Sequence, residues 1–329
     1  MRVLVAYNLL SGSGDTDLYD LVHALGREDC EITLRYFSGN GVLADLVHDA
    51  DRFDRVVVCG GDGTVSTIAY ALRNTGIPLL AYPSGTANLI ASNLGLPFDP
   101  ASLAKLTTSS NYASFDVGEL THLGSLEELP ADRRRGFMMI AGAGFDAAIM
   151  DAAQPLKASM GVLAYFAGVM QNLAPTRASF RITLDGREVT SEGIAVLLVN
   201  FSRLQFDMPL THGSSPRDGL FEVAIVQSRT AVGLIPAVWD AWLDRMVQRP
   251  ERGALEVHSA REILVEADPP LRLQYDGDVI DSTTPFGARV LPGAATLLVP
   301  PASRHASDTR SDRERPISGA RDGTTGRDG

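Results

Sequence analysis

The chain has 329 residues, which is more than most single compact cores contain, so two domains are expected. Hydrophobic residues make up 45% and charged residues 21% of the sequence, an ordinary composition for a globular protein. The formal net charge of -11 argues against a nucleic-acid backbone as the main partner and against attraction of the whole protein to an anionic membrane.

The two cysteines, Cys30 and Cys59, have no cysteine or histidine neighbour at metal-ligand spacing, so nothing in the sequence points to an oxidising compartment. The apolar run at the start of the chain is too short for a signal peptide, and no stretch is long enough and free enough of charge to span a bilayer. We therefore expect a cytoplasmic protein with peripheral access to a membrane.

The first third of the sequence alternates strand-like and helix-like segments. Apolar runs predict buried strands at residues 2–7, 31–37, 55–60 and 78–83. Apolar residues at helical spacing predict helical segments at residues 18–25, 43–47, 65–73 and 86–94. This alternation is typical of a mostly parallel sheet with helices on both faces. It predicts an N-terminal doubly wound α/β nucleotide-binding domain over residues 1–117.

The pattern changes after about Asp116. Strand-like runs joined by turns predict an antiparallel, β-rich second domain over residues 118–300. These runs lie at residues 179–186, 193–201, 219–227, 255–267, 271–280 and 295–300. Two helical segments, 158–173 and 231–247, interrupt them and are the candidates for lipid contact, although such apolar stripes more often belong to a core. The residues from 301 to 329 are almost free of apolar side chains and predict a disordered tail.

The strongest chemical signal is a GGDGT loop between the strand at 55–60 and the helix that follows it. Its residues are Gly60, Gly61, Asp62, Gly63 and Thr64. Consecutive glycines allow a sharp turn, and the N–H groups of the turn and of the helix end then point at an anion such as phosphate. A carboxylate in this loop would repel phosphate unless a cation lay between them. Asp62 is therefore interpreted as a group that handles Mg²⁺ or positions the reacting hydroxyl, and a plain glycine-rich turn is the alternative.

Two further polar loops follow predicted strands, one after residue 7 and one over residues 83–88. The carboxyl ends of parallel strands lie at one edge of a sheet, where ligands bind. Three polar, glycine-containing loops at one edge therefore predict a nucleotide site, to which we assign Asn8, Ser11, Gly12, Gly60, Gly61, Gly63, Thr64, Gly85, Thr86 and Asn88. For the second of these loops, helix capping by Thr86 and Asn88 is an equally good interpretation.

The segments GGDGT, PSGTANLIASNLGLP, AGAGFDAA, SPRDGLFEVAIV and YDGD occur in the order found in diacylglycerol kinase-type catalytic domains. Over most of residues 1–300 the sequence resembles this diacylglycerol kinase/sphingosine kinase family. The resemblance implies an ATP site in the cleft between an NAD kinase-like α/β domain and a β-rich domain, with Mg²⁺ as cofactor and a lipid as acceptor. It also implies that Asp62, Asn88, Asp276 and Asp278 belong to the active site, whereas the residues alone predict only a hairpin turn at Asp276-Gly277.

We assign catalytic roles to Asp62, Asp276 and Asp278. Phosphoryl transfer mainly requires aligned reactants and cations over the developing charge. A lipid hydroxyl is a weak nucleophile, so a carboxylate within hydrogen-bond reach would accept its proton. Asp276 or Asp278 is the candidate base, and Asp62 would assist through Mg²⁺ bound with ATP.

Several positions depart from the family pattern. The family often has Asp after the loop asparagine, where this chain has Leu89, and its first loop usually reads Asn-Pro, where this chain has Leu9. The family's DGE segment ends here in Asp278, which is one methylene shorter, so a water can bridge the missing reach. A structural metal site occurs near Asp218 in some relatives, but Arg217 stands where they often carry another acid, so no structural metal is assigned.

The sequence thus predicts an ATP- and Mg²⁺-dependent lipid kinase acting at a membrane surface, with diacylglycerol as the first choice of acceptor and phosphatidic acid as product. A sphingoid-base or other glycerolipid kinase, an NAD kinase-like phosphotransferase and a catalytically weak lipid- or nucleotide-binding protein stay open as alternatives. No nucleic-acid partner is expected. A homodimer is also open, because dimers are common among the relatives.

Overall fold

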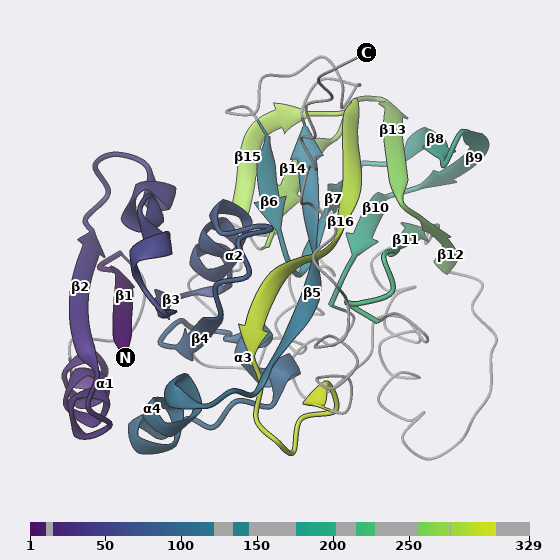
Figure 1. The fold of residues 1–329 in the computed structure, drawn as a ribbon. Coiled ribbons are helices and arrows are strands. Elements are labelled where there is room, and N and C mark those ends of the chain that lie inside the picture. Colours follow the sequence, from purple (N-terminus) through teal and green to yellow (C-terminus); the bar gives the residue numbers. More distant parts are fainter. Residues whose placement is uncertain are drawn as a thin grey trace, which may run out of the picture.

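The computed structural model describes residues 1–10, 16–121, 134–144, 176–201, 215–227, 255–276 and 278–306. These residues form one sheet of ten strands and another of six, with helices beside the first (Figure 1). Ser11, Gly12, Gly277 and the helical segments predicted at 158–173 and 231–247 lie outside the described residues. For Asp278 the structure describes the backbone alone.

Four parallel strands form the N-terminal part of the ten-stranded sheet. They are β1 (Arg2–Asn8), β2 (Glu31–Phe37), β3 (Arg55–Gly60) and β4 (Leu79–Pro83), in the order β2-β1-β3-β4. Nearly every residue of β1, β3 and β4 is buried, as expected for apolar runs covered on both faces. The predicted doubly wound α/β arrangement is confirmed.

Helices surround these strands. Helix α1 (Thr16–Arg27) packs against α4 (Pro100–Thr108), while α2 (Asp62–Ala71) contacts the 3₁₀ helix η1 (Leu43–Val47), which a second 3₁₀ turn, η2 (Ala50–Arg52), follows. Helix α3 (Leu89–Leu94) begins three residues later than predicted because Asn88 before it is left-handed, with φ of 50°. Helix α4 was not predicted, although Asp99 at its N-cap and Pro100 after it are a recognisable start signal.

The six-stranded sheet is antiparallel throughout and confirms the β-rich second part of the chain. Its order is β12-β11-β10-β7-β14-β15. The strands are β7 (Ile140–Ala143), β10 (Ala195–Val199), β11 (Phe221–Val226), β12 (Leu255–Ala260), β14 (Arg272–Tyr275) and β15 (Asp278–Thr283). The run predicted at 255–267 divides at Arg261 into β12 and β13 (Glu262–Asp268), which belong to different sheets.

Two long strands join the N-terminal and C-terminal parts. Strand β16 (Phe286–Leu298) pairs in parallel with β4 at one end and antiparallel with β13 at the other, and β5 (Tyr112–Thr121) pairs along its length. The ten-stranded sheet is completed by β6 (Arg135–Phe137), β8 (Ala178–Leu184) and β9 (Arg187–Gly193). The predicted domain boundary between residues 117 and 118 falls inside β5, and the domain limits stay a prediction.

The residues directly after β16 differ from the predicted tail. Residues 301–306 form turns, and His305 is buried with its ring edge-on to Phe115 at 5.1 Å between ring centroids. Arg217 donates a hydrogen bond of 3.2 Å to the backbone carbonyl of His305. Composition predicted disorder from residue 301, but the ring contact of His305, the hydrogen bond from Arg217 and a hydrogen bond from Arg304 to Asn93 hold these six residues. Residues 307–329 lie outside the described part of the chain.

Asp116, in the middle of β5, connects three segments. Its carboxylate is buried and accepts hydrogen bonds of 2.7 Å from the backbone N–H groups of Gly219 and Gly293, while its own N–H donates to the carbonyl of Pro216. Gly293 lies in the β-bulge where the register of β16 shifts. Burial raises the pKa of Asp116, and the two N–H groups act in the opposite direction. This carboxylate fixes the bulge at which β16 passes between the two parts of the molecule.

We expect Asp116→Asn to lower the free energy of unfolding by about 1–3 kcal/mol. The NH₂ group of the asparagine would face one of the two buried backbone N–H groups and leave it without an acceptor. Urea unfolding followed by circular dichroism measures the change. The control is Asp281→Asn, the same substitution at a fully exposed side chain, which should leave the midpoint unchanged. Equal midpoints for the two variants would refute the role given to Asp116.

Candidate functional site

Three polar loops meet at the carboxyl ends of β1, β3 and β4, as the strand order requires. The first and second loops are tied by Asn8, whose side-chain amide donates a hydrogen bond of 2.8 Å to the hydroxyl of Thr64. The Oδ1 atom of Asn8 accepts the N–H of Leu10 and so shapes the turn after β1. Asn8 therefore holds two loops in register with both ends of its amide.

The second and third loops touch through their backbones at glycine. A Cβ atom on Gly85 would lie 2.5 Å from the Cα atom of Gly61, which is closer than any real contact of this kind. A Cβ atom on Gly60 would lie 2.6 Å from the methyl group of Thr64. The glycines at 60 and 85 are thus required by close approach inside the site. The sequence predicts that glycines here let the backbone turn sharply and approach a phosphate. In the structure Gly85 also lets the third loop approach the second, and Gly60 leaves room for the Thr64 side chain within the GGDGT loop.

Asp62 links the GGDGT loop to helix α3. It is the first residue of α2, yet its carboxylate accepts the N–H groups of Leu89 at 3.1 Å and Ile90 at 2.8 Å, which are the first two residues of α3. It therefore caps a helix from a loop 27 residues earlier in the chain. Burial raises the pKa of Asp62, and the two N–H groups oppose this shift. The side chain interpreted as a Mg²⁺ group therefore connects the GGDGT loop to the start of α3.

The Asn88 side chain closes its own loop. Its Oδ1 atom accepts the N–H of Gly85 and its Nδ2 atom donates to the Gly85 carbonyl, both at 2.8 Å. It makes no capping hydrogen bond to α3, so the capping interpretation of Asn88 is wrong, and Asp62 caps that helix instead. Thr86 lies exposed at the tip of the same loop. Of the two polar side chains assigned to this loop, Thr86 is the one directed to solvent.

Asp276 holds the connection between β6 and β7. Its carboxylate accepts the backbone N–H groups of Met138, Met139 and Ile140 at 2.9, 2.8 and 3.0 Å. Burial of the carboxylate raises the pKa of Asp276 to about 6, against the opposing effect of the Ser66 hydroxyl and the three N–H groups. The hairpin turn predicted at this position is also present, since Tyr275 pairs with Asp278 across it.

Helix α2 brings two of the predicted residues together. Asp62 begins the helix, and Ser66, one turn later, is fully buried beside the Asp276 carboxylate. Four residues of α-helix rise by about 6 Å, so the GGDGT loop and Asp276 are about one helical turn apart. Ser66 escaped the sequence analysis. The signal that could have found it is a small polar residue four positions after Asp62, on the buried face of the helix that follows the loop.

The far end of α2 carries a buried ionic cluster that the sequence analysis also missed. Glu119 accepts hydrogen bonds from the Tyr70 hydroxyl, from Arg134 at 3.1 Å and from Arg289 at 2.6 Å. Burial disfavours the ionised Glu119, but the hydroxyl and the two guanidinium groups outweigh it and hold its pKa below the usual range. Burial and the same carboxylate raise the pKa of Tyr70 to about 12. The cluster fixes the end of α2 on β5 and β16.

Within the described ranges, no group of three or more histidine, cysteine, aspartate or glutamate side chains is arranged to hold a metal ion. In the same ranges, no helix combines the length and the apolarity that crossing a bilayer requires. In the described part of the site the Thr86 side chain is exposed, and Asp62 and Gly63 at the start of α2 are half-buried.

Two protein-family models match the chain. The diacylglycerol kinase catalytic domain matches residues 2–120, and the YegS C-terminal NAD kinase beta sandwich-like domain matches residues 139–299. The sequence is 27% identical over 253 residues to a diacylglycerol kinase of Mycobacterium tuberculosis, covering 75% of this chain and 77% of that protein. It is 26% identical over 301 residues to a Klebsiella pneumoniae protein named "Probable lipid kinase YegS-like", covering 88% of this chain and 93% of that one.

An uncharacterized protein of a Synechocystis species is 29% identical over 256 residues, which are 77% of this chain, and the chain spans 56% of that relative's length. Among solved structures, the fold is similar to that of a diacylglycerol kinase from Bacillus anthracis, with a TM-score of 0.71 at 23% identity. That similarity covers 92% of this chain and 98% of the other. At this identity it establishes the shared fold.

We expect Gly85→Ala to separate the second and third loops, because the added methyl group would meet backbone that cannot give way cheaply. Misplacement by about 1 Å should weaken ATP binding at least tenfold, measured by calorimetry, and lower the melting temperature. The matched control is Gly26→Ala in α1, where an added Cβ has no atom within 4 Å and should be neutral or slightly stabilising. Unchanged ATP affinity in Gly85→Ala would contradict the close approach.

Asp276 should make the stability of the chain depend on pH. Its folded-state pKa of about 6 lies above the usual value of 3.8, so the folded state takes up a proton as the pH falls. Between pH 7.5 and pH 5 this should add about 1 kcal/mol to the free energy of unfolding of the wild type relative to Asp276→Asn, which cannot take up the proton. Urea unfolding at both pH values measures it. Parallel pH profiles of the two proteins would show that Asp276 does not titrate in this range.

Proposed function

This chain is a lipid kinase that belongs to the diacylglycerol kinase family, and from that premise we propose that it phosphorylates diacylglycerol with ATP to give phosphatidic acid. One observation carries the proposal. The polar loops after β1, β3 and β4 are locked into one unit, and the helix that starts in this unit reaches Asp276 in the C-terminal half. Such a unit can hold a nucleotide and an acceptor in fixed relation. We further propose that the acceptor is reached at a membrane surface.

The first turn of α2 is the proposed phosphate site. The first N–H groups of a helix have no acceptor within it and carry the positive end of its dipole, so Gly63 and Thr64 suit a phosphate. The exposed Thr86 hydroxyl would add a donor from the next loop. The side-chain amides of Asn8 and Asn88 form hydrogen bonds within and between the loops. We therefore propose that these two residues act on ATP through the shape of the loops.

Among the described residues of this unit, Asp62 is the one that fits a divalent ion. Each of its oxygens accepts one N–H, and a carboxylate oxygen has a second lone pair. Mg²⁺ is often bound through one or two carboxylates together with substrate phosphates and water, which agrees with a single acid at this position. When bound, the ion would supply positive charge over the phosphates. Asp62 itself keeps α3 and the GGDGT loop together.

Of the two candidate bases, we propose Asp278. Asp276 directs its carboxylate at three backbone N–H groups, so it positions the β6–β7 connection. Asp278 starts β15 two residues later. In the proposed step, the lipid hydroxyl gives its proton to the Asp278 carboxylate as its oxygen bonds to the γ-phosphorus. The bond from that phosphorus to the bridging oxygen breaks, and ADP leaves.

The test offers γ-labelled ATP, Mg²⁺ and mixed micelles with diacylglycerol, sphingosine or monoacylglycerol, and NAD in solution. We expect label in phosphatidic acid. Asp278→Asn should lower turnover about 10²-fold or more at an unchanged melting temperature, because it removes the proton acceptor. Asp276→Asn should instead lower the melting temperature, because it removes an acceptor of buried N–H groups.

Thr86→Val is a second variant, which should raise the KM for ATP more than it lowers kcat. Near-normal turnover of a folded Asp278→Asn protein would refute the base assignment. Label in sphingosine or monoacylglycerol would change the acceptor, and label in NAD would replace the lipid by a soluble substrate. ATP binding without label in any acceptor would identify a binding protein.

A further inference from the structure

Two segments at the carboxyl end of the N-terminal sheet expose apolar side chains. Leu9 and Leu10 follow β1, Tyr36 is the last residue but one of β2, and Val42 lies in the loop after β2. Their exposed fractions range from 47% to 68%, and they make up four of the nine large apolar side chains that the described residues expose. Single exposed apolar residues are normal on a protein surface, whereas a cluster marks a site of contact. We call these four residues the apolar tip.

The two segments of the apolar tip lie against each other. Strands β1 and β2 are parallel neighbours, so their carboxyl ends lie side by side, and Leu9 donates its N–H to the carbonyl of Phe37 at 3.0 Å. A Cβ atom on Gly39 would lie 3.3 Å from a terminal methyl group of Leu10. The glycine at position 39 therefore lets the loop after β2 pass directly beside the Leu10 side chain, and the two segments are in contact at the tip.

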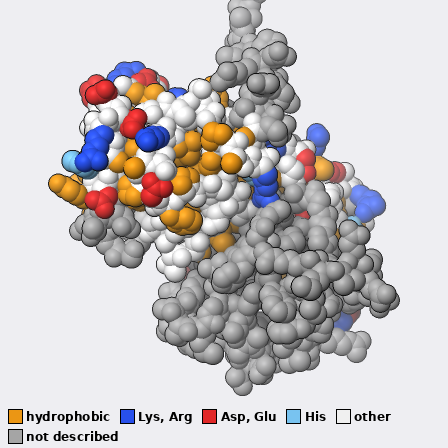
Figure 2. Space-filling view, turned by 90° about the horizontal axis from the view of Figure 1, so that it is seen from below, with side chains coloured by type: hydrophobic (Ala, Val, Ile, Leu, Met, Phe, Trp, Pro, Cys, Tyr) orange, Lys and Arg blue, Asp and Glu red, His pale blue; other side chains and the backbone are white. Residues whose placement is uncertain are grey.

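The sequence around the apolar tip is uncharged. No aspartate, glutamate, lysine, arginine or histidine occurs in residues 7–14 or 36–44. The opposite ends of the same strands differ, since Arg2 and Glu31 begin β1 and β2 and Arg2 pairs with Asp54 at 3.4 Å. Figure 1 marks the N-terminus at the lower end of β1, and Figure 2, seen from below, shows charged side chains of both signs between hydrophobic ones. An apolar, uncharged tip suits the boundary of a bilayer, whereas a net charge of -11 gives the chain no general attraction to anionic head groups.

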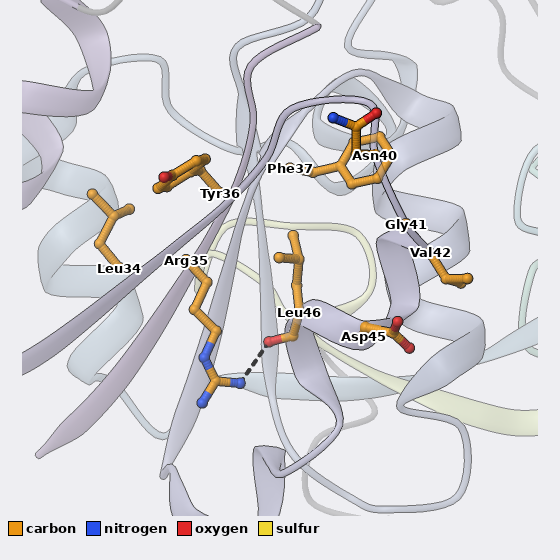
Figure 3. A pocket seen from close by; sticks show the side chains of 9 residues that line it. All are labelled: Leu34, Arg35, Tyr36, Phe37, Asn40, Gly41, Val42, Asp45 and Leu46. Carbon is orange, nitrogen blue, oxygen red and sulfur yellow. Dashed lines mark hydrogen bonds between the residues drawn. The ribbon is translucent and has the colours of Figure 1, made fainter.

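A hollow of about 400 Å³ lies beside the apolar tip, on the side of η1 (Figure 3). Phe37 lines it from the end of β2, and Val42 lines it from the loop that follows. The two charged residues of its lining are Asp45 and Arg35, and the Arg35 guanidinium is paired with Asp49 at 2.6 Å. The arginine is therefore engaged inside the protein, and the hollow adds an apolar wall next to the tip.

We propose that the apolar tip enters the interfacial region of a lipid bilayer and holds the nucleotide site at the membrane. The inference rests on the proposed function, which gives this site a lipid acceptor, and the uncharged sequence around the tip agrees with a bilayer as the occupant. Leu9 and Leu10 directly follow Asn8, which donates a hydrogen bond to Thr64 of the GGDGT loop. Apolar groups of peripheral proteins reach about 5–10 Å into the boundary between head groups and acyl chains. Insertion of the two leucines thus fixes the height of the phosphate site above the bilayer.

Vesicle flotation tests the insertion. The wild type should bind vesicles of phosphatidylcholine and diacylglycerol and stay bound at high salt, because no charge takes part. Leu10→Ser should lower the partition coefficient about tenfold, and adding Val42→Ser should lower it further, because each removes apolar area from the bilayer. The matched control is Leu34→Ser, since Leu34 is 46% exposed on the same strand but lies about 10 Å before its end, and it should bind as the wild type does. Binding that requires an anionic lipid, equal binding of all these proteins, or no binding of the wild type would overturn the proposal.

A fluorescent label reports the position of the tip directly. In a Cys30→Ser background, a nitrobenzoxadiazole label on Val42→Cys should gain intensity and shift its emission to shorter wavelength when vesicles are added. The same label on Leu34→Cys should not shift, and Cys59 is buried and stays in place. A shift of the Val42→Cys label that follows protein concentration without vesicles would show that a second copy covers the tip and would overturn the proposal.

Both measurements are made without ATP, so the two hypotheses fail separately. Tip-dependent binding to vesicles by a protein that labels no lipid would uphold the apolar tip and refute the proposed function. Labelling of a lipid by a protein whose vesicle binding does not depend on Leu10 and Val42 would refute the apolar tip alone.

Discussion

Buried aspartates that accept backbone N–H groups from distant segments hold this structure together. Asp62 accepts N–H groups at the start of α3, and Asp116 accepts those of Gly219 and of Gly293 in the bulge of β16. Asp276 accepts the N–H groups of residues 138–140. A buried N–H left without an acceptor costs about 1–3 kcal/mol, so each carboxylate satisfies two or three such groups at once. The cost is desolvation, and it is visible in the raised pKa of all three.

Helix α2 turns these connections into a site. Its first residue caps α3, its middle places Ser66 beside Asp276, and its last turn places Tyr70 against Glu119. One rigid element about 15 Å long thus joins the phosphate side of the site to the C-terminal half. Phosphoryl transfer depends mainly on alignment, so a helix fixed at three levels suits it. The same arrangement separates the two acids of the DGD segment, one committed to structure and the other proposed for chemistry.

The geometry explains two of the departures from the family pattern, those at Leu89 and Arg217. Leu89, where relatives often carry an acid, is partly buried against the N-terminal core and uses its backbone N–H to bind Asp62. Its contribution to the site is a backbone N–H group, which does not depend on the kind of side chain at this position. Arg217 lies over the ring of Phe115 and holds the segment after β16, so a position that carries an acid in some relatives is used here for packing.

Local patterns in the sequence determined the four parallel strands of the N-terminal part, the antiparallel second half, the hairpin at Asp276 and the place of the GGDGT loop, because hydrophobic periodicity and glycine turns act over a few residues. Only the tertiary structure decided which groups those loops would meet. The partners of Asp62 lie 27 and 28 residues away and those of Asp276 lie 136–138 residues away, and β16 reaches β4 from a position far along the chain. Which group accepts a buried N–H depends on how distant segments pack against each other, and a local sequence pattern does not contain that information.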